Sequence, residues 1–414
     1  MIRRIVINIL MVCISLALAL MLLEAIVRVA GTVDADGQFS FLGYALEPYV
    51  LPINRLKEGI DAYLHNMDTA TILFDEQTGW AYRPNSLRHQ GTFTVNSSGM
   101  RSRREFSEEP LPDTLRIAAF GDSFTAGDDA NDDQVWTNQL ELALQQHGIR
   151  AEVMNFGVGG YDMGQAFLRW RGTGQQFMPD IVIFGFQPEN LDRNVNVFRI
   201  LYIHGPSIPF SKPRFYMNDG NLELINVPAL PPERMVATFE AFATHPLAAF
   251  EDYYRSRDVV SKWWLSSRLG AFIYAVTKAQ EGASGADYGP ASERGMLGKA
   301  IVDAFAADVA ERAADFFVVH LPLPQHMAHV HSGGQSPYRY LLDYLRQTYR
   351  YIPFDESLGP EYMDESYWGP TGHYGAEIEA LLGQTVARAI ADCIEERSCS
   401  TQRFDDPAQF AINR

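Results

Sequence analysis

Ser123 stands where a catalytic nucleophile is expected. It lies in the segment FGDSFTAG, residues 120–127. The apolar run 115–120 is typical of a buried strand, and a polar turn and a helix-period segment follow the serine. On such a turn the side chain projects from the carboxyl edge of a sheet, beside backbone N–H groups that can stabilise a developing negative charge. The position therefore predicts attack by the serine hydroxyl on an acyl carbon.

Two other interpretations apply to the same residues. An ordinary turn would use Asp122 or Ser123 only to cap the next helix. The nucleophile elbow of α/β-hydrolases requires Gly two places after the serine, where this chain has Thr125. An α/β-hydrolase is therefore disfavoured, whereas a plain cap stays open on these residues alone.

Three further segments have polar or flexible residues at the ends of predicted elements. They are NFGVGGY at 155–161, GFQPEN at 185–190 and YWGPTGHYG at 367–375. The first two follow predicted strands, and the third directly precedes the last predicted helix. In a parallel sheet such segments lie at one edge and can meet Ser123 in a single site.

The four segments and their order resemble the SGNH (GDSL) hydrolase superfamily, whose blocks carry Ser, Gly, Asn and His. The resemblance covers residues 114–392, and the leader with its YRPN and NSSGMR motifs is similar to membrane-anchored bacterial members. It implies Ser123 as the nucleophile and His373 as the base.

The same resemblance implies two donors to the oxyanion, the backbone of Gly160 and the side chain of Asn190. Gly160 is preferred to Gly157 because the family's glycine tends to fall five places after the strand-ending Asn, here Asn155. Tyr161 and Leu191 stand where many members have Asp, which is a departure from the family pattern.

The proposed chemistry needs these residue types. A serine hydroxyl is a weak nucleophile and needs a base, for which imidazole has a suitable pKa. The N–H groups of Ser123 and Gly160 and the amide of Asn190 could stabilise the oxyanion, and glycine allows close backbone approach. Taken singly, Gly160 could instead be a plain turn, Asn190 a loop cap and His373 a surface residue.

The acid that orients the histidine is the weakest part of the match. Family members usually carry it two or three residues before the histidine, where this chain has Thr371 and Pro370. Asp364 and Glu365 lie upstream in the same segment and could reach His373, and Asp364 is the predicted partner. A backbone carbonyl could replace it and leave a Ser-His dyad, with activity reduced by roughly 10⁴ as in a serine protease without its Asp.

A histidine cluster after a predicted strand invites a metal hypothesis. It comprises His320, His326, His329 and His331. No nearby Asp, Glu or Cys completes an evident ligand set, so a strand-end loop is the simpler interpretation. We expect no metal site and no cofactor.

The chain alternates strand and helix patterns from Leu115 onward. Predicted strands lie at 115–120, 152–156, 181–186, 315–320 and 350–354, and predicted helices at 134–147, 163–176, 297–313, 337–348 and 374–391. Strands separated by helices of this length form right-handed crossovers and a parallel sheet covered on both faces. The expected fold class is α/β, a three-layer α/β/α sandwich with a five-stranded parallel sheet.

Residues 199–295 interrupt this alternation and are expected to form an inserted cap. An Asp-Gly turn between two alternating runs predicts a hairpin over 214–225. The segment 239–280 is aromatic and mostly helical in pattern. The pair Trp263-Trp264 is expected in the core, and the rim of a substrate groove is the alternative. Upstream, 54–65 has helix-compatible spacing, and a small β element packed on the main domain is expected from Thr78 onward.

The amino-terminal run indicates attachment to a membrane. Residues 5–23 carry no charge and would cover roughly 28 Å as a helix, close to a bilayer core. Arg3 and Arg4 precede the run, which places the amino end in the cytoplasm. We expect an uncleaved single-pass anchor in the bacterial inner membrane with the catalytic domain in the periplasm; a cleaved signal peptide is the alternative.

The net charge and the cysteine content bear on the possible partners and on disulfide formation. The balance of 34 basic and 51 acidic residues gives −17, which argues against a nucleic-acid partner. Cys393 and Cys399 could close a small disulfide loop or remain free thiols. The expected organisation is an anchor at 1–30, a stalk and β leader at 31–113, a hydrolase domain at 114–395 and a tail at 396–414.

The expected function is a serine esterase that removes small acyl groups, with acetyl expected, from an envelope or secreted glycan. Its partners would be the acylated glycan or another ester, the membrane and envelope polysaccharide machinery. An O-acyltransferase would use the same acyl-enzyme, and a catalytically weak glycan-binding or assembly protein would keep only the fold.

Overall fold

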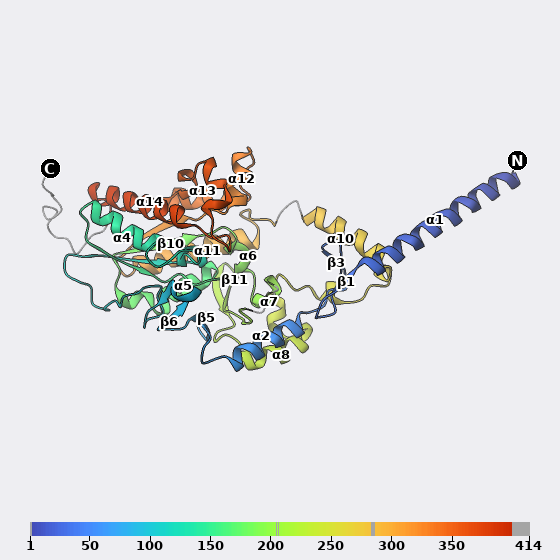
Figure 1. The fold of residues 1–414 in the computed structure, drawn as a ribbon, viewed down its shortest axis with the longest axis horizontal. Helices are drawn as coiled ribbons and strands as arrows, with labels where there is room; N and C mark the ends of the chain where they lie inside the picture. The colour runs from blue at the N-terminus through green and yellow to red at the C-terminus, as the bar shows by residue number, and fades with distance from the viewer. Residues whose placement is uncertain (1, 204, 206, 283–285, 400–414) are drawn as a thin grey trace. The chain divides into compact units, whose positions relative to one another are not determined.

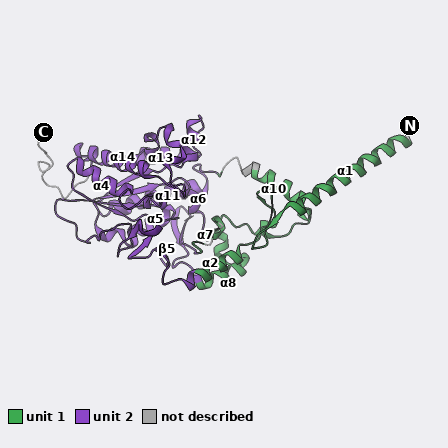
Figure 2. Ribbon diagram, viewed as in Figure 1, with its two compact units in different colours: residues 1–62, 199–209, 233–286 green, residues 63–198, 210–232, 287–414 purple. Residues whose placement is uncertain are grey.

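The computed structural model describes residues 2–203, 205, 207–282 and 286–399. Most of the expected tail at 396–414 lies outside these residues. The chain divides into two compact units (Figure 2). Unit 1 comprises residues 1–62, 199–209 and 233–286, and unit 2 comprises residues 63–198, 210–232 and 287–414.

Unit 2 is built on a five-stranded sheet in which every pairing is parallel. Its strands lie in the order β14-β13-β10-β8-β9. Their bounds are β8 Leu115–Phe120, β9 Ala151–Asn155, β10 Ile181–Phe186, β13 Asp315–His320 and β14 Arg350–Ile352. Numbered along the chain, this is the order 2-1-3-4-5 of flavodoxin-like doubly wound sheets. The predicted five-stranded parallel sheet is confirmed.

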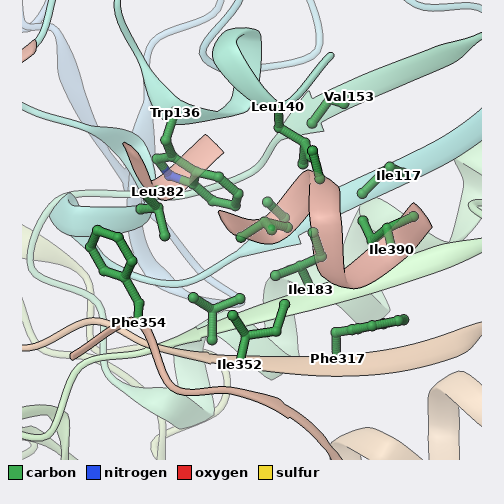
Figure 3. Packing of buried hydrophobic residues seen from close by; sticks show 14 of the residues in the cluster. Ile117, Trp136, Leu140, Val153, Ile183, Phe317, Ile352, Phe354, Leu382 and Ile390 are labelled. Atoms are coloured by element: carbon green, nitrogen blue, oxygen red, sulfur yellow. The ribbon is translucent and has the colours of Figure 1, made fainter. Parts of the chain in front are cut away.

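Helices α4 (Trp136–Gln146) and α14 (Ala376–Glu395) cover one face of this sheet. Strand side chains such as Ile117, Ile183 and Phe317 point into the same buried cluster as side chains of these two helices (Figure 3). Because both faces of a central parallel strand are buried, alternate residues pack on opposite sides.

Helices α5 (Met163–Gly172) and α11 (Glu293–Ala310) cover the other face (Figure 1). The ring of Phe305 on α11 contacts Phe120 of β8, Phe184 of β10 and Phe316 of β13. Trp170 of α5 packs on Phe120 as well. The three-layer α/β/α sandwich is thereby confirmed.

The predicted helices occur with shifted ends. Helix α11 begins four residues earlier than predicted because the Ser292 side chain caps it by accepting from the N–H of Gly295. The predicted helix at 163–176 is divided into α5 and a 3₁₀ turn, Gly174–Phe177. Helix α13 (Arg339–Thr348) lies as predicted, and a short helix, α12 (Pro324–His331), replaces the loop expected for the histidine cluster.

The leader forms two small hairpins in unit 2. Strand β4 (Ile72–Asp75) pairs with β5 (Gly79–Tyr82), and β6 (Ser86–Arg88) pairs with β7 (Phe93–Val95). The predicted hairpin at 214–225 is present as β11 (Arg214–Asn218) and β12 (Asn221–Ile225). A disulfide joins Cys393, in the last turn of α14, to Cys399 beyond the end of the helix.

Unit 1 contains the amino-terminal helix α1 (Ile2–Ala30) and most of the insertion. Its other elements are a three-stranded sheet, β1 (Thr32–Val33), β2 (Phe39–Phe41) and β3 (Tyr44–Ala45), and the helices α2 (Ile53–His65), α7 (Arg199–Tyr202), α8 (Pro232–Glu240), α9 (Ser256–Val259) and α10 (Arg268–Gly282). The helix expected at 54–65 is confirmed as α2. Among the described residues, α1 is the one helix long and apolar enough to span a membrane.

The insertion differs from expectation in two respects. Residues 199–209 and 233–286 group with the amino-terminal region in unit 1, whereas the hairpin β11-β12 belongs to unit 2. The expectation that Trp263 and Trp264 lie in the core is wrong, because their exposed fractions are 88% and 48%. Both fall in or beside a 3₁₀ turn, Trp263–Leu265, rather than on the buried face of a helix.

Candidate active site

Ser123 and His373 meet at the carboxyl edge of the sheet. Ser123 is the first residue of a single-turn helix, α3 (Ser123–Ala126), directly after β8. Asp122 caps this turn by accepting from the N–H of Phe124 at 2.9 Å. The Ser123 Oγ lies 2.7 Å from Nε2 of His373. The serine hydroxyl is thus within hydrogen-bond reach of a base.

A tight hairpin before α14 holds His373 in place. The Gly369 N–H donates to the His373 carbonyl at 2.8 Å, and Trp368 forms a bridge with Tyr374. The buried ring of Tyr374 anchors the hairpin, since its hydroxyl donates to the Pro322 carbonyl. The ring of Phe124, next to the serine, packs 4.7 Å from the imidazole.

Asp129 is the carboxylate at this hairpin. It accepts from the backbone N–H groups of Thr371 at 2.9 Å and His373 at 3.1 Å, and from the Thr371 hydroxyl at 2.9 Å. Its Oδ2 lies 3.6 Å from Nδ1 of His373. A Cβ atom on Gly369 would lie 2.2 Å from Cβ of Asp129, so the close approach of the two loops requires glycine there.

The Thr371 hydroxyl connects this carboxylate to the imidazole. Its Oγ1 lies 2.7 Å from Nδ1 of His373. An ionised carboxylate only accepts, so the single hydroxyl proton of Thr371 is directed to Asp129 and the Oγ1 lone pair faces the ring. Nδ1 must then carry the imidazole proton, which leaves Nε2 as the acceptor for the Ser123 hydroxyl. The arrangement sets the tautomer that a general base requires.

Asp364 does not contact His373 in the structure. It caps the 3₁₀ turn Glu365–Tyr367, and its carboxylate accepts from the N–H and hydroxyl of Ser366 at 2.9 and 2.6 Å. These hydrogen bonds lower the pKa of this exposed carboxyl. The acid was predicted a few residues before the histidine, whereas the carboxylate at this hairpin comes from the loop after the serine, 244 positions before His373.

Asn190 is buried and its amide is oriented by an arginine. It begins helix α6 (Asn190–Asn194) after β10, and its exposed fraction is 1%. Nη1 of Arg193 donates to Oδ1 of Asn190 at 2.8 Å, to the Tyr161 carbonyl at 3.0 Å and to Asp122 at 3.1 Å. Because arginine has no acceptor, Oδ1 must face it and the Nδ2 donor must point elsewhere. One guanidinium therefore connects the loops after β8, β9 and β10.

Gly160 lies in the loop after β9 with φ of 78°, a conformation that favours glycine. Side chains of the leader hold its neighbour. The Gly159 N–H donates to the Tyr82 hydroxyl at 2.8 Å, and Nε1 of Trp80 donates to the Gly159 carbonyl at 2.9 Å. The Tyr82 hydroxyl also donates to Asp128 at 3.1 Å, so β5 contacts both the loop after β9 and the residues that follow α3.

Arg101 supports the loop that carries Asp129. This arginine comes from the NSSGMR motif of the leader and its exposed fraction is 3%. Its guanidinium donates to the carbonyls of Ala126 and Gly127 and, at 2.6 Å, to that of Ala130. The three carbonyls flank Asp129 along the chain. The leader is thus part of the scaffold of the site, which the sequence argument did not foresee.

A buried carboxyl lies beneath this loop. Glu379 on α14 accepts from the Trp136 N–H at 2.6 Å and caps α4, which has no capping side chain of its own. Burial raises the pKa of Glu379 to about 8, although the Trp136 N–H and the charge of Arg101 oppose the shift. Glu379 joins α14, which follows His373, to the beginning of α4.

The predicted histidine cluster is spread over two elements. His320 ends β13, with Nδ1 3.0 Å from Asp355, while His326, His329 and His331 lie on α12. Burial, with His320 nearby, lowers the pKa of His326 to about 4. Across the described part of the chain, no group of three or more His, Cys, Asp or Glu side chains could hold a metal ion.

Of three comparisons with known proteins, only the comparison with solved structures finds similar proteins. No protein-family model matches the chain, and no curated protein matches it. Similar solved structures include a lipolytic protein of the G-D-S-L family from Desulfitobacterium hafniense, at 14% identity, covering 66% of this chain and 99% of that one, with a TM-score of 0.32. A GDSL-like lipase from Bacteroides thetaiotaomicron shares 10% identity over 70% and 93%, with a TM-score of 0.33.

A lipase/acylhydrolase from Enterococcus faecalis is similar at 11% identity over 67% of this chain and 96% of that one, with a TM-score of 0.34. The descriptions of the first two proteins name the family that the sequence motifs resemble. At such identities and TM-scores the likeness carries no argument about activity. The case for function therefore rests on the geometry around Ser123 and His373.

Proposed function

We propose that this protein is a serine ester hydrolase that removes small acyl groups, acetyl above all, from a glycan of the cell envelope or a secreted glycan. The observation that carries the proposal is the 2.7 Å contact between Ser123 Oγ and His373 Nε2, with Nδ1 held by Thr371 and Asp129. Acyl transfer by a serine requires a base within reach of the hydroxyl and a group that orients the base, and His373 with the Thr371–Asp129 pair can supply both.

The proposed reaction has two halves. Nε2 of His373 takes the Ser123 proton as Oγ adds to the ester carbonyl, and the imidazolium then protonates the departing sugar oxygen as its bond to the acyl carbon breaks. The Ser123 and Gly160 N–H groups and Nδ2 of Asn190 are the proposed donors to the oxyanion. In the second half, water gives its proton to Nε2 and attacks the acyl-serine, which releases the carboxylic acid and restores the serine.

The proposed location is the outer side of a membrane spanned by α1. The helix covers Arg3–Ala30, and its apolar side chains from Ile5 to Leu23 are exposed. Arg3 and Arg4 at its amino end favour a cytoplasmic amino terminus. The disulfide Cys393–Cys399 in unit 2 agrees with an oxidising compartment. This location supports an envelope glycan as the source of the ester.

A fluorophosphonate probe tests the nucleophile directly. We expect the full chain in detergent to be labelled and the Ser123→Ala variant to remain unlabelled. Ser332→Ala is the matched control, since Ser332 is an exposed serine after α12. Absence of labelling in folded wild type would favour the binding or assembly protein instead.

Turnover with and without an acceptor tests the reaction class. We expect acetate release from p-nitrophenyl acetate and from an acetylated oligosaccharide, unchanged by an unacetylated acceptor. Formation of an acylated acceptor would instead identify an O-acyltransferase with the same acyl-enzyme.

A further inference from the structure

The transmembrane helix and the insertion are joined by a capping interaction inside unit 1. The carboxylate of Glu24 on α1 accepts from the N–H groups of Arg268 at 2.9 Å and Leu269 at 2.7 Å and from the Ser267 hydroxyl at 2.7 Å. These groups form the first turn of α10, whose N–H groups have no partners within the helix. Glu24 therefore fixes the beginning of α10 at one height along α1.

Apolar side chains also join α1 to α10, close to Glu24. Val27 of α1 shares a buried cluster with Ala271 and Ala275 of α10 and with Leu265 just before it. The residues just before α10 therefore lie beside the end of α1 that follows its apolar run.

The height of this junction follows from helix geometry. Twenty residues separate Arg4 from Glu24, and a rise of about 1.5 Å per residue gives roughly 30 Å, the thickness of a bilayer core. With Arg4 at the cytoplasmic surface, Glu24 lies at the outer surface. The segment immediately before α10 is thereby held at the level of the outer headgroups.

That segment presents three apolar side chains to its surroundings. Val260, Trp263 and Trp264 have exposed fractions of 60%, 88% and 48%; we call them the tryptophan surface. The ammonium of Lys262 lies 5.7 Å from the ring of Trp264 and binds Glu47. Tryptophan next to a cationic side chain suits the boundary between lipid and water, where the ring meets acyl chains and its N–H meets water or headgroups.

We propose that the tryptophan surface inserts into the outer boundary of the bilayer that α1 spans. The inference rests on the proposed membrane anchor and adds to it a second contact, which sets the height and tilt of unit 1 at the lipid surface. If α1 were the only contact with the membrane, unit 1 could rotate about the axis of this helix and tilt. A second contact, made by aromatic side chains beside that axis, restricts both motions.

Quenching of tryptophan fluorescence by brominated lipids tests the placement in the full chain. We expect wild type in proteoliposomes to be quenched more by bromine near the headgroup than by bromine near the chain end. The Trp263→Phe/Trp264→Phe variant should lose at least half of the lipid-dependent quenching, since its remaining tryptophans belong to unit 2. Trp368→Phe, a change in unit 2, is the matched control and should leave the quenching as in wild type.

Quenching that is equal in wild type and in the double variant would overturn the proposal. An emission shift on adding oligosaccharide, without lipid quenching, would assign the tryptophans to glycan binding and overturn it as well. Alkaline carbonate extraction separates the proposal from its premise. If carbonate released the wild-type protein from the membrane, the anchor itself would be refuted. If the wild-type protein stayed in the membrane but showed no quenching, only the tryptophan contact would be refuted.

Discussion

The carboxylate of Asp129 lies 3.6 Å from Nδ1 of His373, and the hydroxyl of Thr371 links the two. In the usual triad the acid accepts directly from Nδ1. Here the Thr371 hydroxyl donates to the carboxylate and accepts from Nδ1, so the carboxylate orients the imidazole through the hydroxyl. The link explains how a chain with Thr and Pro in place of the expected acid can still hold the catalytic tautomer.

Removing the relay hydroxyl should slow catalysis. Thr371→Val keeps the shape of the side chain but leaves Nδ1 without its partner. Loss of a hydrogen bond in a charged network costs about 1.5–3 kcal/mol, so kcat should fall about 10- to 100-fold. Steady-state kinetics with p-nitrophenyl acetate measures the effect, and KM should change little. Thr371→Ser retains the hydroxyl and should keep most of the activity; equal losses in both variants would contradict the relay.

Asp129→Asn should be more damaging than loss of the hydroxyl. An asparagine amide can donate to Thr371, whose hydroxyl proton would then face Nδ1 and favour the wrong tautomer. We expect kcat to fall by about 10³–10⁴. Asp364→Asn is the matched control, because that carboxylate contacts Ser366 instead, and its kcat should stay within about twofold of wild type. A larger loss in Asp364→Asn than in Asp129→Asn would restore the original assignment.

Asn190→Ala tests the proposed oxyanion donor. Because Arg193 holds Oδ1, the amide can offer Nδ2 to the developing charge. Loss of one such donor lowers kcat about 100- to 1000-fold in serine enzymes. Kinetics of Asn221→Ala, at an exposed asparagine that begins β12, provide the comparison. An unchanged kcat in Asn190→Ala would remove Asn190 from the site.

Arg101→Lys should weaken both fold and site. A lysine cannot donate to the three carbonyls of Ala126, Gly127 and Ala130 in the same geometry, and buried carbonyls without donors are costly. We expect the free energy of unfolding to fall by about 2–4 kcal/mol and kcat to fall with it, because the loop carrying Asp129 loosens. Urea unfolding measures the first effect. Arg104→Lys, at a half-exposed arginine, should change stability by less than about 0.5 kcal/mol.

The buried carboxyl of Glu379 predicts a pH dependence of stability. Its pKa is about 8 in the native state, against 4.5 for the free side chain. Between these values the native state binds a proton that the unfolded chain has released, so stability decreases as pH rises, by at most about 1.4 kcal/mol per pH unit. Above about pH 8 this contribution is lost.

Urea unfolding between about pH 5 and 8 measures this trend. Glu379→Gln should flatten it, because the amide does not titrate. Glu377→Gln on the exposed side of the same helix should leave it as in wild type. A slope that persists in Glu379→Gln would place the titrating group elsewhere.

The sheet was predictable because its strands are short, apolar and separated by helices. Strands β8, β10 and β13 have the predicted bounds, since both faces of each are buried and nothing competes with the run of apolar residues. Helix ends were less predictable. The beginning of α4 depends on Glu379, a side chain 243 positions away, and no local pattern contains that information.

The site residues were predictable only where the neighbouring residues in the sequence indicate the role. Ser123 and His373 stand next to glycine-containing turns and lie together as expected. Asp129 was missed because its partners lie in another loop, and the signal for it was slight, a pair of aspartates shortly after the serine turn. The small β element of the leader was predicted to pack on the main domain, but the contacts of Tyr82 and Arg101 were not predicted, because a strand or turn pattern does not show which loops its side chains will contact.

The contacts of Tyr82, Trp80 and Arg101 make the leader a functional part of unit 2. A soluble fragment cut at the start of the strand-helix alternation would lack all three side chains. Its loops after β8 and β9 would keep their own residues but lose the hydrogen bonds from these leader side chains. Boundaries for soluble expression are therefore better placed before β4, and a protease that cleaved between β7 and β8 in the cell and released the leader would inactivate the protein without touching Ser123.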